Sequence, residues 1–227
     1  MGTKKHYRHG RKRTPRLSWG TFIILAIGIG LMAYGGMFYW DRHNRTNSPQ
    51  PLANIPQEVN HVITEPDETP IDTRQEYSVP SDQPRSITIG SAQIHGFVQR
   101  VATEPNGAIA VPSNIHLAGW YVDSQRPGES GLSIIDGHVS GRYADAIFKD
   151  LHATANGDRI TVEFGDLRTV EFEIVDKHYS PADQAAAILT KKRAEIDAQL
   201  NLITCSGTYD AEEKTFDERL IVVARKI

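Results

Sequence analysis

The sequence contains a single cysteine, Cys205, among its 227 residues. A disulfide within the chain is therefore excluded, and the thiol is free and reactive, paired with another molecule, or buried as a small apolar side chain. Cys205 ends the run Asn201–Thr204, which predicts a short buried strand, and Ser206-Gly207 predicts the turn after it. A cysteine at a strand end beside a glycine turn is well placed to expose a nucleophile.

Acidic residues are missing from the N-terminal part of the chain. Residues 1–16 contain seven Lys and Arg but no acid, and residues 17–40 contain no charged residue at all. This uncharged run is longer than the roughly 20 residues that cross a bilayer as a helix. We expect a basic cytoplasmic tail over 1–16 and a transmembrane signal anchor over 17–40, with the C-terminal bulk outside the cell. A cleaved signal peptide is the alternative, but no clean Ala-x-Ala site follows the run.

Residues 41–85 lack any sustained apolar period. Seven of the chain's 12 prolines fall in this segment, and Asn, Gln, Thr, Asp and Glu fill most of the rest. Such a composition predicts a Pro-rich, disordered extracellular linker that holds the following domain away from the membrane.

Residues 86–227 lack a basic surplus, an internal repeat and the spacing of a calcium loop. They carry 14 Lys and Arg against 20 Asp and Glu, which argues against a nucleic-acid partner. We find no metal-ligand pattern and expect no cofactor. The segment is long enough for one domain with its own core.

Short β-type runs separated by turn residues fill this domain. They are expected at Ser86–Ile89, Ile94–Val101, Leu117–Val122, Leu132–Ile135, Arg159–Phe164, Val170–His178, Asn201–Cys205 and Arg219–Ala224. Eight such runs predict a mainly β fold, either a closed barrel or a sandwich. Two segments have helical spacing, a short one at Tyr143–Leu151 and a longer one at Ala182–Leu200.

A reactive cysteine needs a base or a cationic partner. Among the five histidines of residues 86–227, His138 stands out because it follows a predicted strand between Gly137 and Gly141. Arg219 opens the last predicted strand. If the strands of Cys205 and Arg219 form an antiparallel hairpin about the polar run at residues 210–214, residue 205 lies opposite residue 219. Each residue alone is more often structural than catalytic.

Together, these stretches resemble the sortases, the cysteine transpeptidases of bacterial cell surfaces. The family's Thr-Leu-x-Thr-Cys motif corresponds to Asn201–Cys205, which departs at its first position only. Its Gly-His motif corresponds to Gly137-His138, and its Arg-x-Ile/Val-Val motif to Arg219–Val222. The stretches Gly119–Tyr121 and Pro127–Gly131 are most similar to class F and class E-type sortases, although Asp217 stands where many class F members have the arginine.

The resemblance implies an eight-stranded sortase barrel over residues 86–227. It implies that Cys205 attacks the threonine carbonyl of an LPXTG-like sorting signal, that His138 exchanges protons with the leaving and incoming amines, and that Arg219 binds substrate carbonyls or the oxyanion. The substrate-binding residues that it implies, or that we infer beside it, are Thr204, Gly119, Trp120, Tyr121, Ile188 and Leu189.

The expected partners are surface proteins with C-terminal LPXTG-like signals, an amine acceptor and the membrane. The acceptor is a peptidoglycan precursor or a pilin lysine. Two other functions stay open at this stage: another cell-surface cysteine hydrolase or transpeptidase, and a non-enzymatic anchored barrel protein.

Overall fold

The computed structural model describes residues 28, 30–37, 39–40, 55–59 and 65–227. The chain divides into a unit of residues 1–43 and a unit of residues 44–227. In the first unit the described residues are helical, and the rest of the predicted tail and span lies outside the described residues. Within the described parts of the chain, no helix is both long and apolar enough to cross a membrane.

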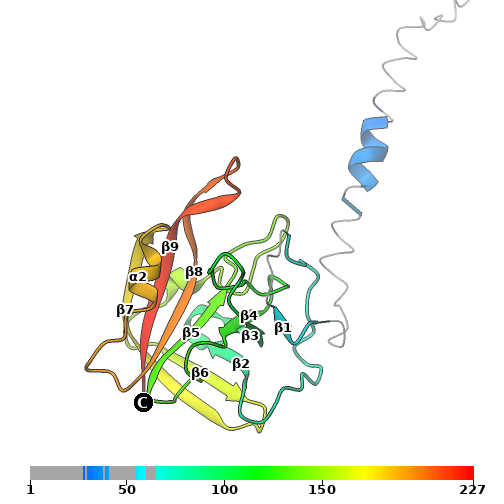
Figure 1. Ribbon diagram of the computed structural model, residues 1–227. Helices are drawn as coiled ribbons and strands as arrows, with labels where there is room; N and C mark the ends of the chain where they lie inside the picture. Colours follow the sequence, from blue (N-terminus) through cyan, green and yellow to red (C-terminus); the bar gives the residue numbers. More distant parts are fainter. Residues whose placement is uncertain (1–27, 29, 38, 41–54, 60–64) are drawn as a thin grey trace, which may run out of the picture. The chain divides into compact units, whose positions relative to one another are not determined.

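The second unit is a sheet of nine strands that closes on itself (Figure 1). The strands are β1 (Glu58–Val59), β2 (Pro84–Ile89), β3 (Ile94–Val101), β4 (Ala118–Tyr121), β5 (Gly131–Gly137), β6 (Arg159–Phe164), β7 (Thr169–Pro181), β8 (Ala198–Asp210) and β9 (Thr215–Lys226). Their order is β1-β3-β2-β6-β7-β9-β8-β5-β4, and a further pairing of β3 with β4 closes the ring. The eight strands β2–β9 therefore form the predicted closed barrel, and the two-residue β1 adds to the outside of β3.

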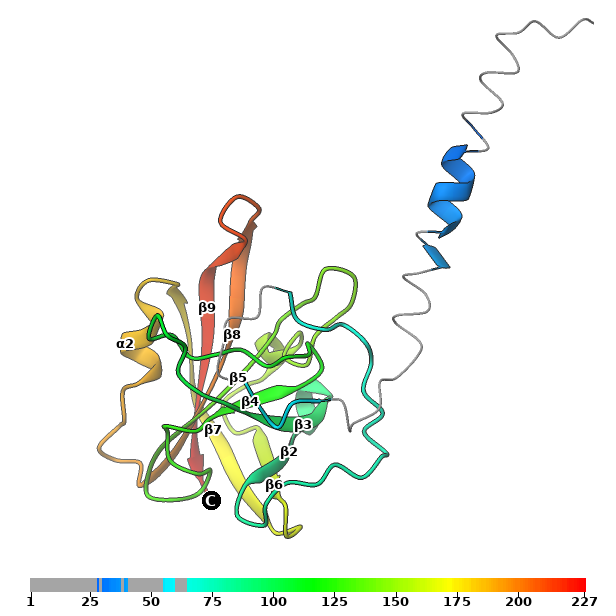
Figure 2. The same ribbon diagram turned by 45° about the vertical axis from the view of Figure 1, so that its right-hand side comes forward.

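Side chains on β8 and β9 alternate between the two faces of the barrel wall, because strand side chains have a period of two. Leu200, Leu202 and Val222 belong to the cluster that fills the barrel, whereas Ile221 and Val223 belong to a second cluster under α2 (Ala185–Leu189). Figure 2 shows α2 outside the barrel, alongside β7 and β9. Both faces of these strands are covered here, which explains their nearly continuous apolar sequences.

The two predicted helices differ from the structure. The segment Tyr143–Leu151 consists of turns that lead into the short 3₁₀ helix η3 (Leu151–Ala153), and the structure has a second such turn, η2, at Gly90–Ala92. The segment Ala182–Leu200 contains only the five-residue α2. The Asn201 side-chain amide donates to the Leu189 carbonyl, and the Gln199 amide donates to the Lys191 carbonyl. These side chains bind the backbone where the helix ends, so residues from Ala198 onward join the sheet.

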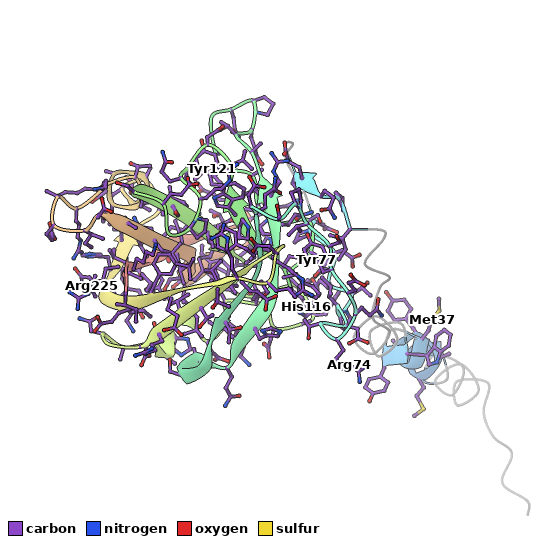
Figure 3. All side chains as sticks on the ribbon, turned by 90° about the horizontal axis from the view of Figure 1, so that it is seen from below. Met37, Arg74, Tyr77, His116, Tyr121 and Arg225 are labelled. Carbon is purple, nitrogen blue, oxygen red and sulfur yellow. The ribbon has the colours of Figure 1, made fainter. Side chains whose placement is uncertain are left out.

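The described part of the predicted linker is packed against the barrel rather than disordered. Ile55, Val59 and Tyr77 are each less than 5% exposed, and the Tyr77 ring stacks on Phe97 with centroids 4.6 Å apart. In Figure 3, Tyr77 lies on the side of the molecule away from Arg225. Isolated apolar anchors in a polar sequence produce no period, so the sequence did not predict this packing. Residues 41–54 and 60–64 lie outside the described residues.

Candidate active site

Cys205 and Arg219 are direct partners in the antiparallel pairing of β8 and β9. This confirms the register predicted from the polar run between them. Cys205 follows Ile203 by two residues and Arg219 precedes Ile221 by two, so both lie on the outer face, beyond the end of the cluster under α2. The pairing becomes irregular directly after Ser206, where Gly207 has a φ of +82°. Cys205 therefore lies one residue before the end of the regular pairing between β8 and β9.

His138 reaches the same level of the barrel from the other side of β8. Strand β5 runs parallel to β8, and Asp136 pairs with Ile203. Strand β5 ends at Gly137, so His138 is the first residue beyond it, two residues after Asp136, as Cys205 is two residues after Ile203. The three residues expected from the sequence therefore form a row that runs from the end of β5 across β8 to β9.

Burial favours the neutral form of both His138 and Cys205. The His138 Nε2 atom lies 3.1 Å from the Pro112 carbonyl oxygen, and burial lowers the pKa of the ring despite this contact. Burial also raises the pKa of the Cys205 thiol; Arg219 opposes that shift, and Asp136 adds to it. At rest these groups are thus a thiol and a neutral imidazole.

The Arg219 guanidinium is held by its own strand. Its Nη1 donates to the carbonyl oxygens of Phe216 and Glu218, at 2.8 and 2.9 Å, and its Nη2 donates to Thr215 Oγ1 at 3.2 Å. Asp217 is not its partner, because the Asp217 carboxylate accepts from the Thr208 amide instead. The guanidinium is only partly buried, so its remaining donors stay available to a ligand.

Thr204 links the strand of the cysteine to the strand of the histidine. It is 5% exposed, and its hydroxyl donates to the Gly137 carbonyl at 2.7 Å. Since Gly137 precedes His138, this bond fixes the end of β5 relative to Cys205. Thr204 therefore stabilises the site from the inner face of the barrel wall and is not part of an open surface.

The other predicted substrate-binding residues are in mixed environments. Trp120 is 5% exposed in the barrel core and donates to the Gln125 carbonyl, whereas Tyr121 is partly buried and shares a 2.7 Å hydrogen bond with Thr103. Gly119 pairs with Asp136 across β4 and β5. Leu189, the last residue of α2, is buried, whereas its neighbour Ile188 is half-buried.

Asp136 is a site residue that the sequence analysis missed. It is 8% exposed, and its Oδ1 atom has no hydrogen-bond partner within the described structure. Burial raises the pKa of this carboxyl well above its usual range. The available signal was its spacing: Asp136 precedes His138 by two residues, so both side chains belong to one face of the strand.

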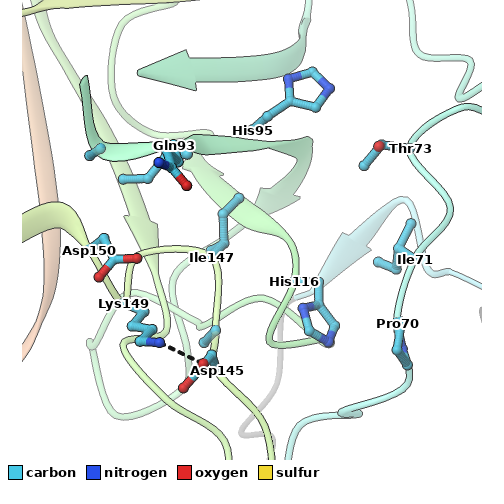
Figure 4. Close-up of a pocket in the computed structure, with 13 residues that line it drawn as sticks. Pro70, Ile71, Thr73, Gln93, His95, His116, Asp145, Ile147, Lys149 and Asp150 are labelled. Carbon is cyan, nitrogen blue, oxygen red and sulfur yellow. Dashed lines mark hydrogen bonds and ion pairs between the residues drawn. The ribbon is translucent and has the colours of Figure 1, made fainter. Parts of the chain in front are cut away.

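The remaining histidines of the domain have other surroundings. His178 lies 3.0 Å from the Asp176 carboxylate, and Arg193 contacts both. His116 lines an open pocket of about 320 Å³ together with His95 and the Lys149–Asp145 ion pair (Figure 4). No lining residue of this pocket is Cys205, His138 or Arg219, so it is separate from the candidate active site.

The family model of the sortase domain matches residues 87–227. Among solved structures, a lid mutant of sortase A from Corynebacterium diphtheriae is 21% identical, with 68% of this chain and 74% of that chain covered and a TM-score of 0.49. Sortase A from Listeria monocytogenes is 20% identical, with 64% and 88% covered and a TM-score of 0.46.

Sortase C1 from Streptococcus agalactiae is 20% identical, with 67% of this chain and 72% of that chain covered and a TM-score of 0.49. No curated protein matches the chain. The family model covers more than half of the chain and includes the row formed by His138, Cys205 and Arg219. The chain therefore belongs to the sortase family, whose members are cysteine transpeptidases.

Proposed function

We propose that this sortase cleaves an LPXTG-like sorting signal after its threonine and transfers the protein to an amine. The observation that carries the proposal is the direct pairing of Cys205 with Arg219, with His138 directly after the end of the neighbouring strand β5. A nucleophile, a proton carrier and a fixed donor are the groups that acyl transfer from a peptide bond requires.

The first half of the reaction forms a thioacyl-enzyme. The Cys205 sulfur attacks the threonine carbonyl while its proton passes to His138, whose imidazole is neutral at rest. His138 then returns that proton to the leaving amine as the peptide bond breaks. The free donors of Arg219 hold the carbonyl oxygen that becomes negative during the attack.

The second half reverses these steps with a different amine. The incoming amine attacks the thioester carbonyl, its proton passes to His138, and the sulfur leaves with a proton returned to it. The acceptor is an amine of a peptidoglycan precursor or a pilin lysine. Gly119, Tyr121 and Ile188 are the proposed groove residues, because each lies on or near the outer face that carries Cys205, whereas Trp120 belongs to the barrel core.

The proposed location is the outer side of the cell membrane. The basic residues 1–16 and the uncharged residues 17–40 support a signal anchor with a cytoplasmic N-terminus. Protease added to spheroplasts should then degrade the barrel domain and spare the tail. A barrel domain that is protected until the membrane is broken would contradict this orientation.

The proposed reaction is tested with an LPXTG-type peptide and a small amine, by following cleavage and transfer by chromatography. Cys205→Ala should abolish both, whereas Ser206→Ala, which changes the next residue on the same strand, should retain them. Turnover by Cys205→Ala near the wild-type rate would refute a mechanism through this sulfur.

A further inference from the structure

Asp136 lies on the same outer face as Cys205. Among the described residues, its Oδ1 atom lacks the hydrogen-bond donor or cation that a buried carboxylate oxygen needs. It lies on β5 between Gly119 of β4 and Ile203 of β8. Cys205 is two residues beyond Ile203 on this face. From strand spacings, the Cα atoms of Asp136 and Cys205 are therefore about 8 Å apart. The Asp136 Oδ1 atom is buried and unbonded within the described structure.

The residues around the Asp136 Oδ1 atom leave room for the carboxyl group but offer it no opposite charge. A Cβ at position 119 would overlap Asp136 Oδ1, so the glycine leaves the space that the carboxyl occupies. The next atoms that this Cβ would meet belong to Val101 and Pro112, which are apolar. An ionised carboxylate in such surroundings is costly because no described residue places a hydrogen-bond donor or a cation beside its Oδ1 atom.

The titratable and charged groups that face Asp136 are few. On its own strand the group is His138, and on β8 it is Cys205. On β9 it is Arg219, whose side chain donates hydrogen bonds to its own strand, and on β4 it is Tyr121, which is hydrogen-bonded to Thr103. Asp136 and Cys205 are therefore two acids in one half-buried site, and a charge on either opposes a charge on the other.

We propose that Asp136 is a positioning residue that acts through Cys205: its ionised form restrains the nucleophile, and its protonated form releases it. The effect on the thiol is directional, because Asp136 raises the pKa of Cys205 whereas Arg219 lowers it. The reactivity of the sulfur is thus set by a balance between a carboxyl on β5 and a guanidinium on β9. Its importance for transpeptidation rests on the proposed function, but the effect on the thiol does not.

The test measures the rate at which iodoacetamide alkylates the full-length protein between pH 5 and 10. The thiolate displaces iodide and forms an S–C bond, so the rate reports the thiolate fraction. Asp136→Asn keeps the shape of the side chain but cannot ionise. We expect its alkylation profile to move to lower pH, and its rate to exceed that of the wild type about tenfold at pH values where the wild-type carboxyl is ionised and the thiol is not, the size of effect expected for a charge at this separation.

Ser133→Ala is the matched control. Ser133 is on the same strand, is fully buried and has an unpartnered hydroxyl, but it faces the opposite side of the wall. Its alkylation profile should match that of the wild type. An Asp136→Asn profile that overlaps the wild-type profile, or a Ser133→Ala profile that moves with it, would overturn the proposal.

The wild-type profile gives a second measurement that does not depend on the variant's folding. Because ionisation of Asp136 makes ionisation of the thiol harder, the wild-type rate should rise with pH less steeply than one independent ionisation predicts, and a profile that fits a single ionisation would contradict the proposal. Alkylation requires no peptide substrate. A shifted Asp136→Asn profile in a protein that fails to cleave LPXTG-type peptides would leave this inference standing and remove only the proposed function.

Discussion

At the scale of single residues, Arg219 illustrates how the fold prepares a side chain before any substrate arrives. Its three hydrogen bonds to Phe216, Glu218 and Thr215 fix the plane of the guanidinium on β9. A planar fork of donors can keep these bonds and still offer an N–H to a ligand, whereas an ammonium group cannot reproduce that geometry.

Arg219→Lys should therefore be nearly as damaging as Arg219→Ala. We expect either change to lower kcat/KM by about 10²–10³, the cost of removing an oxyanion donor. Arg225→Lys is the control, because Arg225 lies on the same strand and forms only a surface pair with Glu173. If Arg219→Lys stays within a few-fold of the wild type, Arg219 supplies charge alone and does not orient the carbonyl.

The residues of the site were predictable to different degrees. Cys205 and Arg219 follow from a strand, a polar loop and a second strand, because an antiparallel hairpin fixes which residues face each other. Asp136 precedes a glycine at the end of an apolar run, a position typical of a turn. Its role depends on the parallel pairing of β5 with β8, which joins segments about 65 residues apart and leaves no local pattern in the sequence.

At the scale of elements, the connection between β7 and β8 departs most from its sequence pattern. The apolar spacing of Ala182–Leu200 suits a helix, yet its last residues pair with both β5 and β9. Gln199 and Asn201 bond to the backbone around residues 189–193 and hold the turn after α2. Tertiary burial of these strand residues outweighs a local preference of a few tenths of a kcal/mol per residue.

The segment before β2 is an element that contributes to both stability and the site. Tyr77 packs on Phe97, and the Glu68 carboxylate accepts hydrogen bonds from the backbone amides of Arg142 and Tyr143. Those amides belong to the loop that follows His138. The segment thus holds the loop on which the histidine depends.

A fragment of residues 86–227 should accordingly be less stable than one of residues 44–227. It loses the buried side chains of Ile55, Val59 and Tyr77, each worth about 1.5–3 kcal/mol when fully buried. A fragment beginning at residue 65 keeps Tyr77 and should lie between the two. The free energy of unfolding in urea measures the series, and equal values for all three fragments would mean that the segment contributes nothing.

At the scale of the whole molecule, buried titratable groups make stability depend on pH. Asp136 has a raised pKa in the folded state, so above pH 3.8 the unfolded chain binds fewer protons than the folded one. Its contribution therefore lowers stability as pH rises from 3.8 toward the folded-state pKa. His116 and His138 act in the opposite direction: burial lowers their pKa values, and stability falls as pH drops through 6.5.

Asp136→Asn should therefore raise the melting temperature at pH 7 by a few degrees, since one unit of pKa difference corresponds to about 1.4 kcal/mol. The gain should shrink as the pH falls toward 3.8 and vanish below it, where the wild-type carboxyl is protonated in both states. Asp183→Asn, at an exposed position, is the control and should show no such trend. A gain that is constant with pH would point to packing rather than to ionisation.

The whole barrel was more predictable than its boundary. Eight β-type runs with intervening turns were enough to predict a closed mainly β fold, because each strand carries its own period-two or continuous apolar pattern. The described residues between 55 and 85 pack on the barrel through a few widely spaced apolar side chains, of which Tyr77 is the largest. Such anchors are identified only when the surface that receives them is known.

The central proposal is that Cys205 carries the acyl group, and intact-mass spectrometry tests it most directly. The protein is mixed with an LPXTG-type peptide in the absence of an added amine and quenched in acid. We predict a mass increase equal to the peptide fragment that ends in threonine, located on the proteolytic fragment containing Cys205 and released by hydroxylamine. Peptide cleavage without this adduct, or the same adduct in Cys205→Ala, would contradict the mechanism.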